Sequence, residues 1–333
     1  MTSGRPVTVA VDAVGGDEAP AAVLAGVTDA LEADPALTVA LVGPEGVVAP
    51  FEDGNERLLA VAAEEVIGMD EQPAAAVRAK KASSIVVGCR LVAEGVAQAF
   101  FSAGNTGAAM TAATLVMGRV EGVARPAIAA VIPASDRPVV LLDVGAQADA
   151  KPENLVQFAH MGAAYADIVL GAVNPRVALL NIGEEPSKGS SLTKAAYELM
   201  SAQVPGFIGN AEGRDIPAGR ADVIVTDGFT GNVCLKLLEG LAKSLLSQVR
   251  DAMTANLPGK VAASVLKPSL RRLKERIDPD TYGGAPLLGV AGVCIIGHGS
   301  SGPRAVSSAL RVAAQAVRGD LPGRISEAVS EAG

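Results

Sequence analysis

Short segments rich in β-branched residues alternate along this chain with longer alanine-rich segments whose apolar residues recur at helical spacing. The strand-like runs are residues 7–11, 37–42, 99–102, 127–132, 139–142, 177–182, 222–226 and 293–296. The helix-like segments are residues 19–33, 74–97, 107–118, 153–170, 192–200, 231–253 and 304–317. Such alternation is typical of βαβ units, and continuously apolar strands suit a sheet that helices cover on both faces. The sequence therefore predicts a doubly wound, mostly parallel α/β fold with three layers, α/β/α.

The length of 333 residues suits one or two domains. We find neither an internal repeat of 20 to 50 residues nor a low-complexity linker that would mark a boundary. We therefore expect a single domain over residues 1–333, with two lobes around a cleft as the variant. Residues 240–280 are expected to form a projecting helical region.

Composition narrows the classes of partner. The net charge is -8 and aromatic residues make up 3% of the chain, so a dedicated nucleic-acid binder is not expected. The three cysteines are far apart without metal-ligand spacing, which predicts reduced thiols in a cytosolic protein and no metal site. Asp12 interrupts the first apolar stretch, so no secretory signal is expected. The longest apolar stretch, residues 285–297, is shorter than the roughly 20 residues of a spanning helix.

Glycine and small polar residues follow almost every expected strand. The segments concerned are 12–17 (DAVGGD), 102–107 (SAGNTG), 143–147 (DVGAQ), 181–185 (NIGEE), 226–232 (TDGFTGN) and 297–301 (GHGSS). Glycine allows close backbone approach to a ligand, and ligands of open α/β sheets gather beyond the carboxyl ends of strands. The sequence therefore predicts a polar cleft that can hold an anion.

Several familiar chemistries lack their motifs. We find neither a G-x-x-x-x-G-K-[ST] loop nor a G-x-G-x-x-G turn after the first strand. His160 lies inside an expected helix, which favours a structural role, whereas His298 lies in a glycine loop. Cys234 and Cys294 are best interpreted as small buried hydrophobic residues. Two roles remain open for Lys188, that of a solvated surface lysine and that of a cation that binds an anion.

Longer stretches around these loops resemble the phosphate acyltransferase family of bacterial phospholipid synthesis, known as PlsX. The similarity covers almost the whole chain and is carried by residues 11–17, 77–84, 102–108, 141–146, 179–185, 207–210, 226–232, 282–289 and 298–301. Two positions depart from the family pattern, with Val14 where Met is usual and Gln147 where Asn is usual.

The resemblance implies transfer of a long-chain fatty acyl group from acyl carrier protein to inorganic phosphate, giving an acyl phosphate for phospholipid synthesis. It also implies a fold similar to the isocitrate and isopropylmalate dehydrogenases, and a homodimer without a cofactor. A membrane acyl-phosphate:glycerol-3-phosphate acyltransferase would consume the product. We expect a cytoplasmic protein that contacts the inner face of the plasma membrane peripherally.

The chemistry of this transfer fits a site poor in histidine. A thiol leaving group with a pKa of about 8.5 needs little help from an acid, and phosphate is already largely ionised near neutral pH. We therefore expect direct transfer without a covalent enzyme intermediate. The expected catalytic residues are Asn105, Thr106, Lys188, Asp227, Asn232 and His298. The expected substrate-binding residues are Asp12, Gly15, Gly16, Asp17, Ser102, Gly104, Gly107, Asp143, Thr230, Gly231 and Lys236.

Three alternatives stay open. A phosphotransacetylase-like enzyme would use coenzyme A thioesters, and a nicotinamide-dependent decarboxylating dehydrogenase would share the general fold. A non-catalytic membrane scaffold would bind lipid without releasing a thiol.

Residues 257–277 are locally basic in an acidic chain. Six lysines and arginines stand against the single acid Glu275, and apolar residues recur at helical spacing on either side of Pro268. Such a helix can lie on an anionic membrane or attract an acidic carrier protein; packing against a dimer mate is the alternative. The expected contact residues are Val261, Val265, Lys267, Leu270, Arg271, Arg272 and Leu273.

Overall fold

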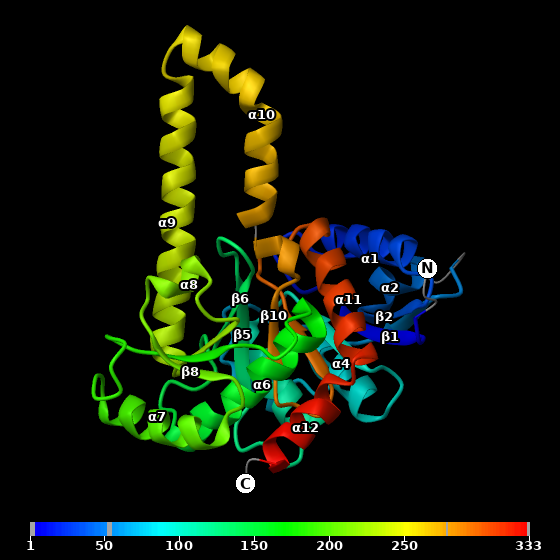
Figure 1. Cartoon of the computed structure of the whole chain (residues 1–333). Coiled ribbons are helices and arrows are strands. Elements are labelled where there is room, and N and C mark those ends of the chain that lie inside the picture. The colour runs from blue at the N-terminus through cyan, green and yellow to red at the C-terminus, as the bar shows by residue number, and fades with distance from the viewer. Residues whose placement is uncertain (1–3, 52–54, 278, 332–333) are drawn as a thin grey trace.

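The computed structural model describes residues 4–51, 55–277 and 279–331, with the side chains of 257, 262, 272–277 and 279–280 left out. Its centre is one sheet of eleven strands in the order β3-β2-β1-β4-β11-β10-β5-β6-β9-β7-β8 (Figure 1). The strands are β1 (Val7–Asp12), β2 (Leu37–Gly43), β3 (Leu58–Ala62), β4 (Ala99–Ser102), β5 (Ala127–Ile132), β6 (Val139–Leu142), β7 (Val177–Leu180), β8 (Phe207–Ala211), β9 (Val223–Val225), β10 (Ala285–Leu288) and β11 (Val293–Ile296). The α/β fold with a mostly parallel sheet is confirmed.

The direction of the strands changes near the middle of the sheet. β10 runs antiparallel to both of its neighbours, β11 and β5, and β5 runs antiparallel to β6. The strands β1, β2, β3, β4 and β11 are therefore parallel to one another, while β6, β7, β8 and β9 form a second parallel group that runs the opposite way. Along the strand axis, the carboxyl ends of the first group therefore point one way and those of the second group point the other way.

Helices cover both faces of the sheet, as the continuously apolar strands predict. One face packs against α1 (Ala21–Ala33), α6 (Pro152–Leu170), α7 (Ser191–Gln203), α11 (Pro303–Arg318) and α12 (Leu321–Glu331). The other packs against α3 (Pro73–Ala79), α4 (Ser84–Ala93), α5 (Thr106–Ala112) and α8 (Asp215–Ala218). The short elements α2 (Glu45–Val48), η1 (Ala49–Phe51), η2 (Ala113–Met117) and η3 (Pro279–Tyr282) complete the described chain. Residues alternate between the faces along β1, since Val9 and Val11 pack on the first and Ala10 on the second.

Some elements differ from the sequence prediction. β3 and β8 form the two ends of the sheet, where half-exposed strands give a weak apolar signal, and β10 contains Pro286. The helix expected over 74–97 is divided into α3 and α4, because Ser83 forms a β-bridge with Glu65 between them. The helix α12 was not expected at all, because Pro322 and Gly323 in its first turn are typical of a loop.

The helices α9 (Gly228–Thr254) and α10 (Leu257–Ile277) rise away from the sheet as a projecting pair, as expected (Figure 1). α9 is 27 residues long, which corresponds to about 40 Å. Among the described helices, none combines the length and apolar character required to cross a membrane. The assignment of one domain over 1–333 stays a prediction.

His160 lies on α6 in the core, where it is 7% exposed and its Nε2 has no hydrogen-bond partner among the described residues. Burial lowers the pKa of His160 below its ordinary value, against smaller opposite effects of the Gln203 backbone and Glu331. The folded protein therefore holds this imidazole neutral at a pH where the unfolded chain already protonates it.

We predict that this histidine makes the protein less stable as the pH falls below about 6.5. The folded-state pKa lies below the unfolded one, so the unfolded state binds the extra proton. The free energy of unfolding therefore falls as the pH is lowered, by at most about 1.4 kcal/mol per pH unit. Urea unfolding at pH 7.5, 6.5 and 5.5 should give a shallower pH dependence for His160→Leu than for wild type. Equal slopes for the two proteins would contradict a neutral buried His160.

Candidate active site

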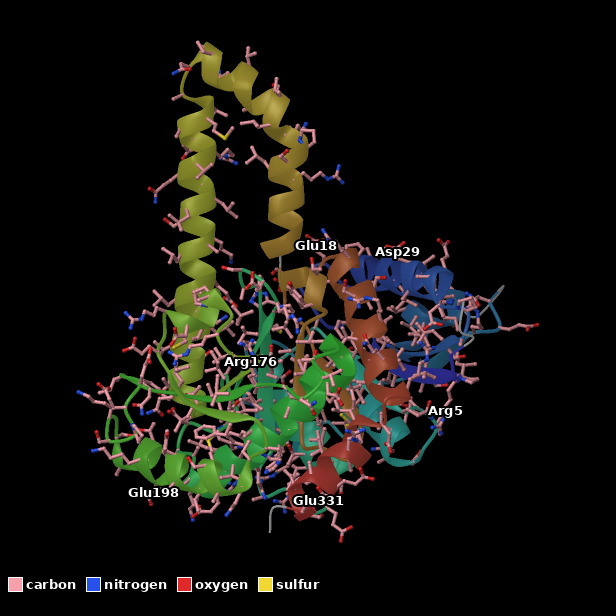
Figure 2. All side chains as sticks on the ribbon, in the orientation of Figure 1. Arg5, Glu18, Asp29, Arg176, Glu198 and Glu331 are labelled. Atoms are coloured by element: carbon pink, nitrogen blue, oxygen red, sulfur yellow. The ribbon has the colours of Figure 1, made fainter. Side chains whose placement is uncertain are left out.

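The polar loops at the strand ends fall into two sets, because the two parallel strand groups run in opposite directions. The first loop set follows β1, β4 and β11 and comprises residues 12–17, 102–107 and 297–301. The second loop set follows β6, β7 and β9 and comprises residues 143–147, 181–190 and 226–232. In Figure 1 the start of α9, in the second set, lies on the opposite side of the β5–β6 pair from β1. Glu18, labelled in Figure 2, directly follows the first loop set and also lies on the β1 side.

The buried side chain of Asp12 is hydrogen-bonded to two loops of the first loop set. It is 2% exposed, and its Oδ2 accepts a hydrogen bond of 2.7 Å from Oγ of Ser102. Oδ1 accepts from the amide of Val14 at 3.3 Å. Burial raises the pKa of Asp12 despite these bonds and a further one from Ser84. The carboxylate therefore fixes the turns after β1 and β4, and its acceptors are occupied by protein donors.

The glycines of the first loop set allow the turns to touch. A Cβ on Gly15 would lie 2.6 Å from Oδ2 of Asp12 and 2.7 Å from the amide nitrogen of Gly104. Gly16 has a φ of +113°, which other residues rarely adopt, and Asp17 donates its amide to the carbonyl of Gly299 at 2.7 Å. These contacts bring three of the predicted loops into one arrangement.

Asn105 is 6% exposed and uses its side chain within the protein. Its Oδ1 accepts the amide of Ala108 at 3.0 Å and so caps α5. Its Nδ2 donates to the carbonyls of Gly68, Met69 and Glu71 at 3.1, 3.3 and 3.1 Å. Both ends of the Asn105 amide are therefore engaged by protein groups, and its catalytic role stays a prediction.

Thr106, Asp17 and His298 are the exposed side chains of the first loop set that sequence analysis selected. The Thr106 hydroxyl has no hydrogen-bond partner among the described residues, and its neighbour Gly107 packs against Pro73. His298 Nδ1 lies 2.8 Å from Oγ of Ser300. Thr106 and His298 are therefore open to solvent, whereas Asp12, Ser102 and Asn105 are buried and hydrogen-bonded to the loops.

The second loop set has a buried carboxylate of its own. Asp143 is fully buried and accepts the amides of Ile128, Gly145, Ala146 and Gln147 at 2.6 to 3.1 Å. Burial raises the pKa of Asp143 in spite of these four bonds. Gln147, one of the departures from the family pattern, contributes main-chain contacts to this turn, since its carbonyl accepts the amide of Gly228 at 2.8 Å. A Cβ on Gly231 would overlap the carbonyl oxygen of Asp143, so glycine is required there.

The start of α9 presents Asn232 beside this turn. Asp227 caps the helix, accepting the amide of Thr230 at 2.9 Å and the Thr230 hydroxyl at 2.7 Å. Asn232 is exposed. Lys236, one turn later, pairs with Glu239 at 3.0 Å along the helix surface. Lys188 is exposed in the loop after β7, where its carbonyl accepts Nδ2 of Asn181 at 3.1 Å.

The cysteines are poor nucleophiles in this structure. Cys89 and Cys294 are buried, and burial raises the pKa of Cys89 and raises that of Cys294 to about 12. Burial also raises the pKa of the half-buried Cys234, with a smaller contribution from Asp227. The reactive thiolate form is therefore disfavoured at all three positions at neutral pH.

The residues expected at a membrane or carrier protein lie on α10. Val261 and Val265 are 67% and 76% exposed, Lys267 and Arg271 are exposed, and Leu270 is half-buried. The side chains of Arg272 and Leu273 lie outside the described residues.

Sequence reasoning missed the segment between β3 and α3. Residues 65–72 reach the first loop set and hold Met69, which is 54% exposed, beside Gly299. The sequence segment VRAKKASS at 77–84 could have pointed to residues 65–72, because its Lys80 forms an ion pair of 2.7 Å with Glu71.

We predict that Asp12 and Asp17 differ sharply in their importance for stability. Asp12→Ala leaves the buried donors of Ser102 and Val14 without acceptors and should lower the free energy of unfolding by about 3 kcal/mol. The exposed Asp17→Ala should change it by less than about 0.5 kcal/mol. Urea unfolding at pH 7.5 measures both, and equal losses would argue against the bracing role of Asp12.

Comparison with known proteins agrees with this architecture. The family described as "Fatty acid synthesis protein" matches residues 7–324. A phosphate acyltransferase of Heliobacterium modesticaldum is 50% identical over 324 residues, covering 96% of each chain, and one of Bacillus pumilus is 46% identical, covering 97% of this chain and 98% of that protein.

In fold, a phosphotransacetylase from Streptococcus pyogenes is similar with a TM-score of 0.62 at 18% identity, covering 94% of each chain. A branched-chain phosphotransacylase from Enterococcus faecalis gives 0.56 at 16%, covering 93% of this chain and 99% of that one. The close sequence relationship over nearly the whole length shows that this chain belongs to the family of phosphate acyltransferases.

Proposed function

We propose that this phosphate acyltransferase transfers a long-chain fatty acyl group from acyl carrier protein to inorganic phosphate. The product would be an acyl phosphate, which a membrane acyl-phosphate:glycerol-3-phosphate acyltransferase would use for phosphatidic acid synthesis. The observation that carries the proposed mechanism is the state of the three thiols, since all have a raised pKa and two are buried. An acyl-cysteine intermediate is thereby disfavoured, which supports direct transfer.

In the direct reaction a phosphate oxygen attacks the carbonyl carbon of the thioester. A new C–O bond forms, the C–S bond breaks, and the thiolate leaves with the electron pair of that bond. The protein's task is to hold both substrates in contact and to stabilise the oxyanion that develops on the carbonyl oxygen. Neutral donors such as hydroxyls, amides and backbone N–H groups can perform it.

We assign this task to the first loop set, with Thr106 and His298 as the groups that reach the ligand. Three protein loops are held rigidly there by Asp12 and the packed glycines, and rigid donors stabilise charge without reorganisation. Thr230, Asn232, Asp227 and Lys188, in the second loop set, are proposed as further substrate contacts. Lys236 is the weaker candidate because Glu239 already neutralises it.

A coenzyme A thioester is the second candidate donor. The likeness in fold to a phosphotransacetylase favours it, although that similarity rests on 18% identity. The two donors share the thioester and differ in what carries it, so a direct comparison of carrier protein and coenzyme A thioesters decides between them.

We predict phosphate-dependent thiol release from palmitoyl acyl carrier protein, at a higher kcat/KM than from palmitoyl coenzyme A. Thr106→Val should lower kcat/KM by about tenfold or more, because it removes an exposed hydroxyl from the first loop set. Asn232→Leu tests the second set in the same assay, and Thr28→Val, an exposed threonine on α1, is the matched control.

Thiol release that does not depend on phosphate, or a stable acyl adduct on any cysteine, would contradict direct transfer. Unchanged turnover of Thr106→Val together with a loss in Asn232→Leu would move the reaction to the second loop set.

We further propose a homodimer that touches the inner face of the plasma membrane through the helical pair. The dimer proposal is supported by an exposed apolar stripe on α9, formed by Phe229, Val233, Leu237, Leu241 and Leu245 at four-residue intervals. On α10, Val261 and Val265 are exposed together with Lys260 and Lys267. Exposed valines with nearby lysines suit an anionic lipid surface or an acidic carrier protein.

We predict that two pairs of substitutions separate these surfaces. Val261→Glu with Val265→Glu should reduce flotation with vesicles rich in anionic lipid and keep the mass of a dimer in sedimentation. Leu241→Asp with Leu245→Asp should convert the dimer to a monomer, because it places charges in the stripe. Unchanged flotation of the first variant would contradict membrane contact through α10, and a monomeric wild type would contradict the dimer.

A further inference from the structure

The segment of residues 65–72, called the strap below, crosses the end of the sheet that holds the first loop set. It begins after β3 at one end of the sheet and reaches the turn after β4, three strands further along. Neighbouring strands are about 4.8 Å apart, so the strap spans roughly 14 Å across the carboxyl ends of β2 and β1. Its middle therefore lies over the loops in which we place acyl transfer.

One ion pair and several hydrogen bonds hold the strap at both of its ends. Glu65 forms a β-bridge with Ser83 and accepts the amide of Ala82 at 3.0 Å. Lys80 donates to the carbonyl of Val66 at 2.8 Å and to Glu71 at 2.7 Å. The strap is a fixed element of the structure whose shape depends on these contacts.

Asn105 connects the strap to the first loop set. Its Nδ2 donates to three strap carbonyls, those of Gly68, Met69 and Glu71, while its Oδ1 caps α5. One buried side chain thus sets the distance between the strap and the turn that presents Thr106.

Met69 is the side chain that this arrangement presents. It is 54% exposed, and a Cβ on Gly299 would lie 3.3 Å from its Cε and 3.3 Å from Oδ1 of Asp17. Val66, also on the strap, is 41% exposed. The strap therefore supplies one apolar side chain, that of Met69, beside the polar loops.

We propose that the strap is the wall of the transfer site that contacts the acyl group, with Met69 as the residue that touches its carbons next to the thioester and Asn105 as the positioning residue that holds Met69 there. This inference rests on the proposed acyl transfer at the first loop set. A methionine suits the role because its unbranched, polarisable side chain adapts to a flexible apolar chain. Asn105 then affects the reaction through the strap, without touching either substrate.

Protection of Met69 from oxidation tests the contact. Dilute hydrogen peroxide is applied to the full-length protein with palmitoyl acyl carrier protein or with apo-carrier protein, in buffer without phosphate so that the donor does not turn over. Mass spectrometry measures the rate of sulfoxide formation at Met69. We expect palmitoyl carrier protein to slow it by about fivefold or more and apo-carrier protein to leave it unchanged. Equal rates with both carriers, protected or unprotected, would overturn contact between Met69 and the acyl group.

The variant Asn105→Asp tests the positioning role. Aspartate keeps the acceptor that caps α5 but lacks the N–H donors that hold the strap. We expect the KM for palmitoyl carrier protein to rise about tenfold while the KM for phosphate stays unchanged, since only the acyl wall moves. Asn55→Asp, where Oδ1 accepts the amide of Arg57 at 3.1 Å just before β3, is the matched control and should keep wild-type constants.

A fall in kcat alone, or equal rises of both KM values in Asn105→Asp, would overturn the positioning role. Wild-type activity separates this inference from the proposed function. If wild type releases thiol in a phosphate-dependent manner and Met69 is not protected, the strap inference alone fails. If wild type releases no thiol from either donor, the proposed function fails first.

Discussion

Asp12 is the last residue of β1 and Asp143 directly follows β6, and both lie in the interior of the protein, where a carboxylate is costly to bury unless donors surround it. Both carboxylates have such donors. Asp12 accepts from the Ser102 hydroxyl and from the amide of Val14, and Asp143 accepts from four backbone amides. Each carboxylate fixes the glycine turn from beneath, and each loop set is built around one of them. The exposed groups of both sets owe their positions to these buried charges, whose own pKa values are raised by the same burial.

This division of labour suits a transfer that needs donors in fixed places more than it needs a strong base. Buried residues such as Asp12 and Asn105 hold the frame, and small exposed groups such as Thr106 face the solvent. The strongest nucleophile among ordinary side chains, the cysteine thiolate, is suppressed by burial. In the proposed direct transfer, positioning and oxyanion stabilisation would be the means of catalysis, and both depend on rigid turns.

The fold could be predicted well from the sequence because helical and strand periodicity is a local property. All eight expected strands are present, and the strands that escaped notice are the two sheet ends and a proline-containing strand. The direction reversal at β10 was not predictable from that rhythm, since it depends on pairing between distant segments. For the same reason the grouping of the polar loops into two sets by strand direction was not visible in the sequence, and the expectation of one polar cleft stays a prediction.

At the level of single residues the sequence identified the loops better than the roles within them. Asn105 was expected at the reacting atoms because its residue type donates and accepts hydrogen bonds. The structure shows those bonds made to the cap of α5 and to the carbonyls of 68–71, which lie more than 30 positions earlier in the chain. Met69 carries no polar group and stood in no strand-end loop, so its place beside Gly299 required the packed structure.

The long helix α9 connects the second loop set to the proposed dimer surface on α9 and to the proposed membrane surface on α10. It begins at the Asp227 cap and continues for 27 residues, about 40 Å, before the chain turns into α10. The proposed membrane contact on α10 therefore holds the start of α9, and Asn232 with it, far above a lipid surface. An acyl phosphate held at the second loop set would have to cross that distance with its chain shielded from water. The apolar stripe along α9 runs in the same direction, and in a dimer it would be covered by the partner. In the proposed dimer, shielding the product would be a task for both copies, because the stripe on α9 is exposed in a single copy.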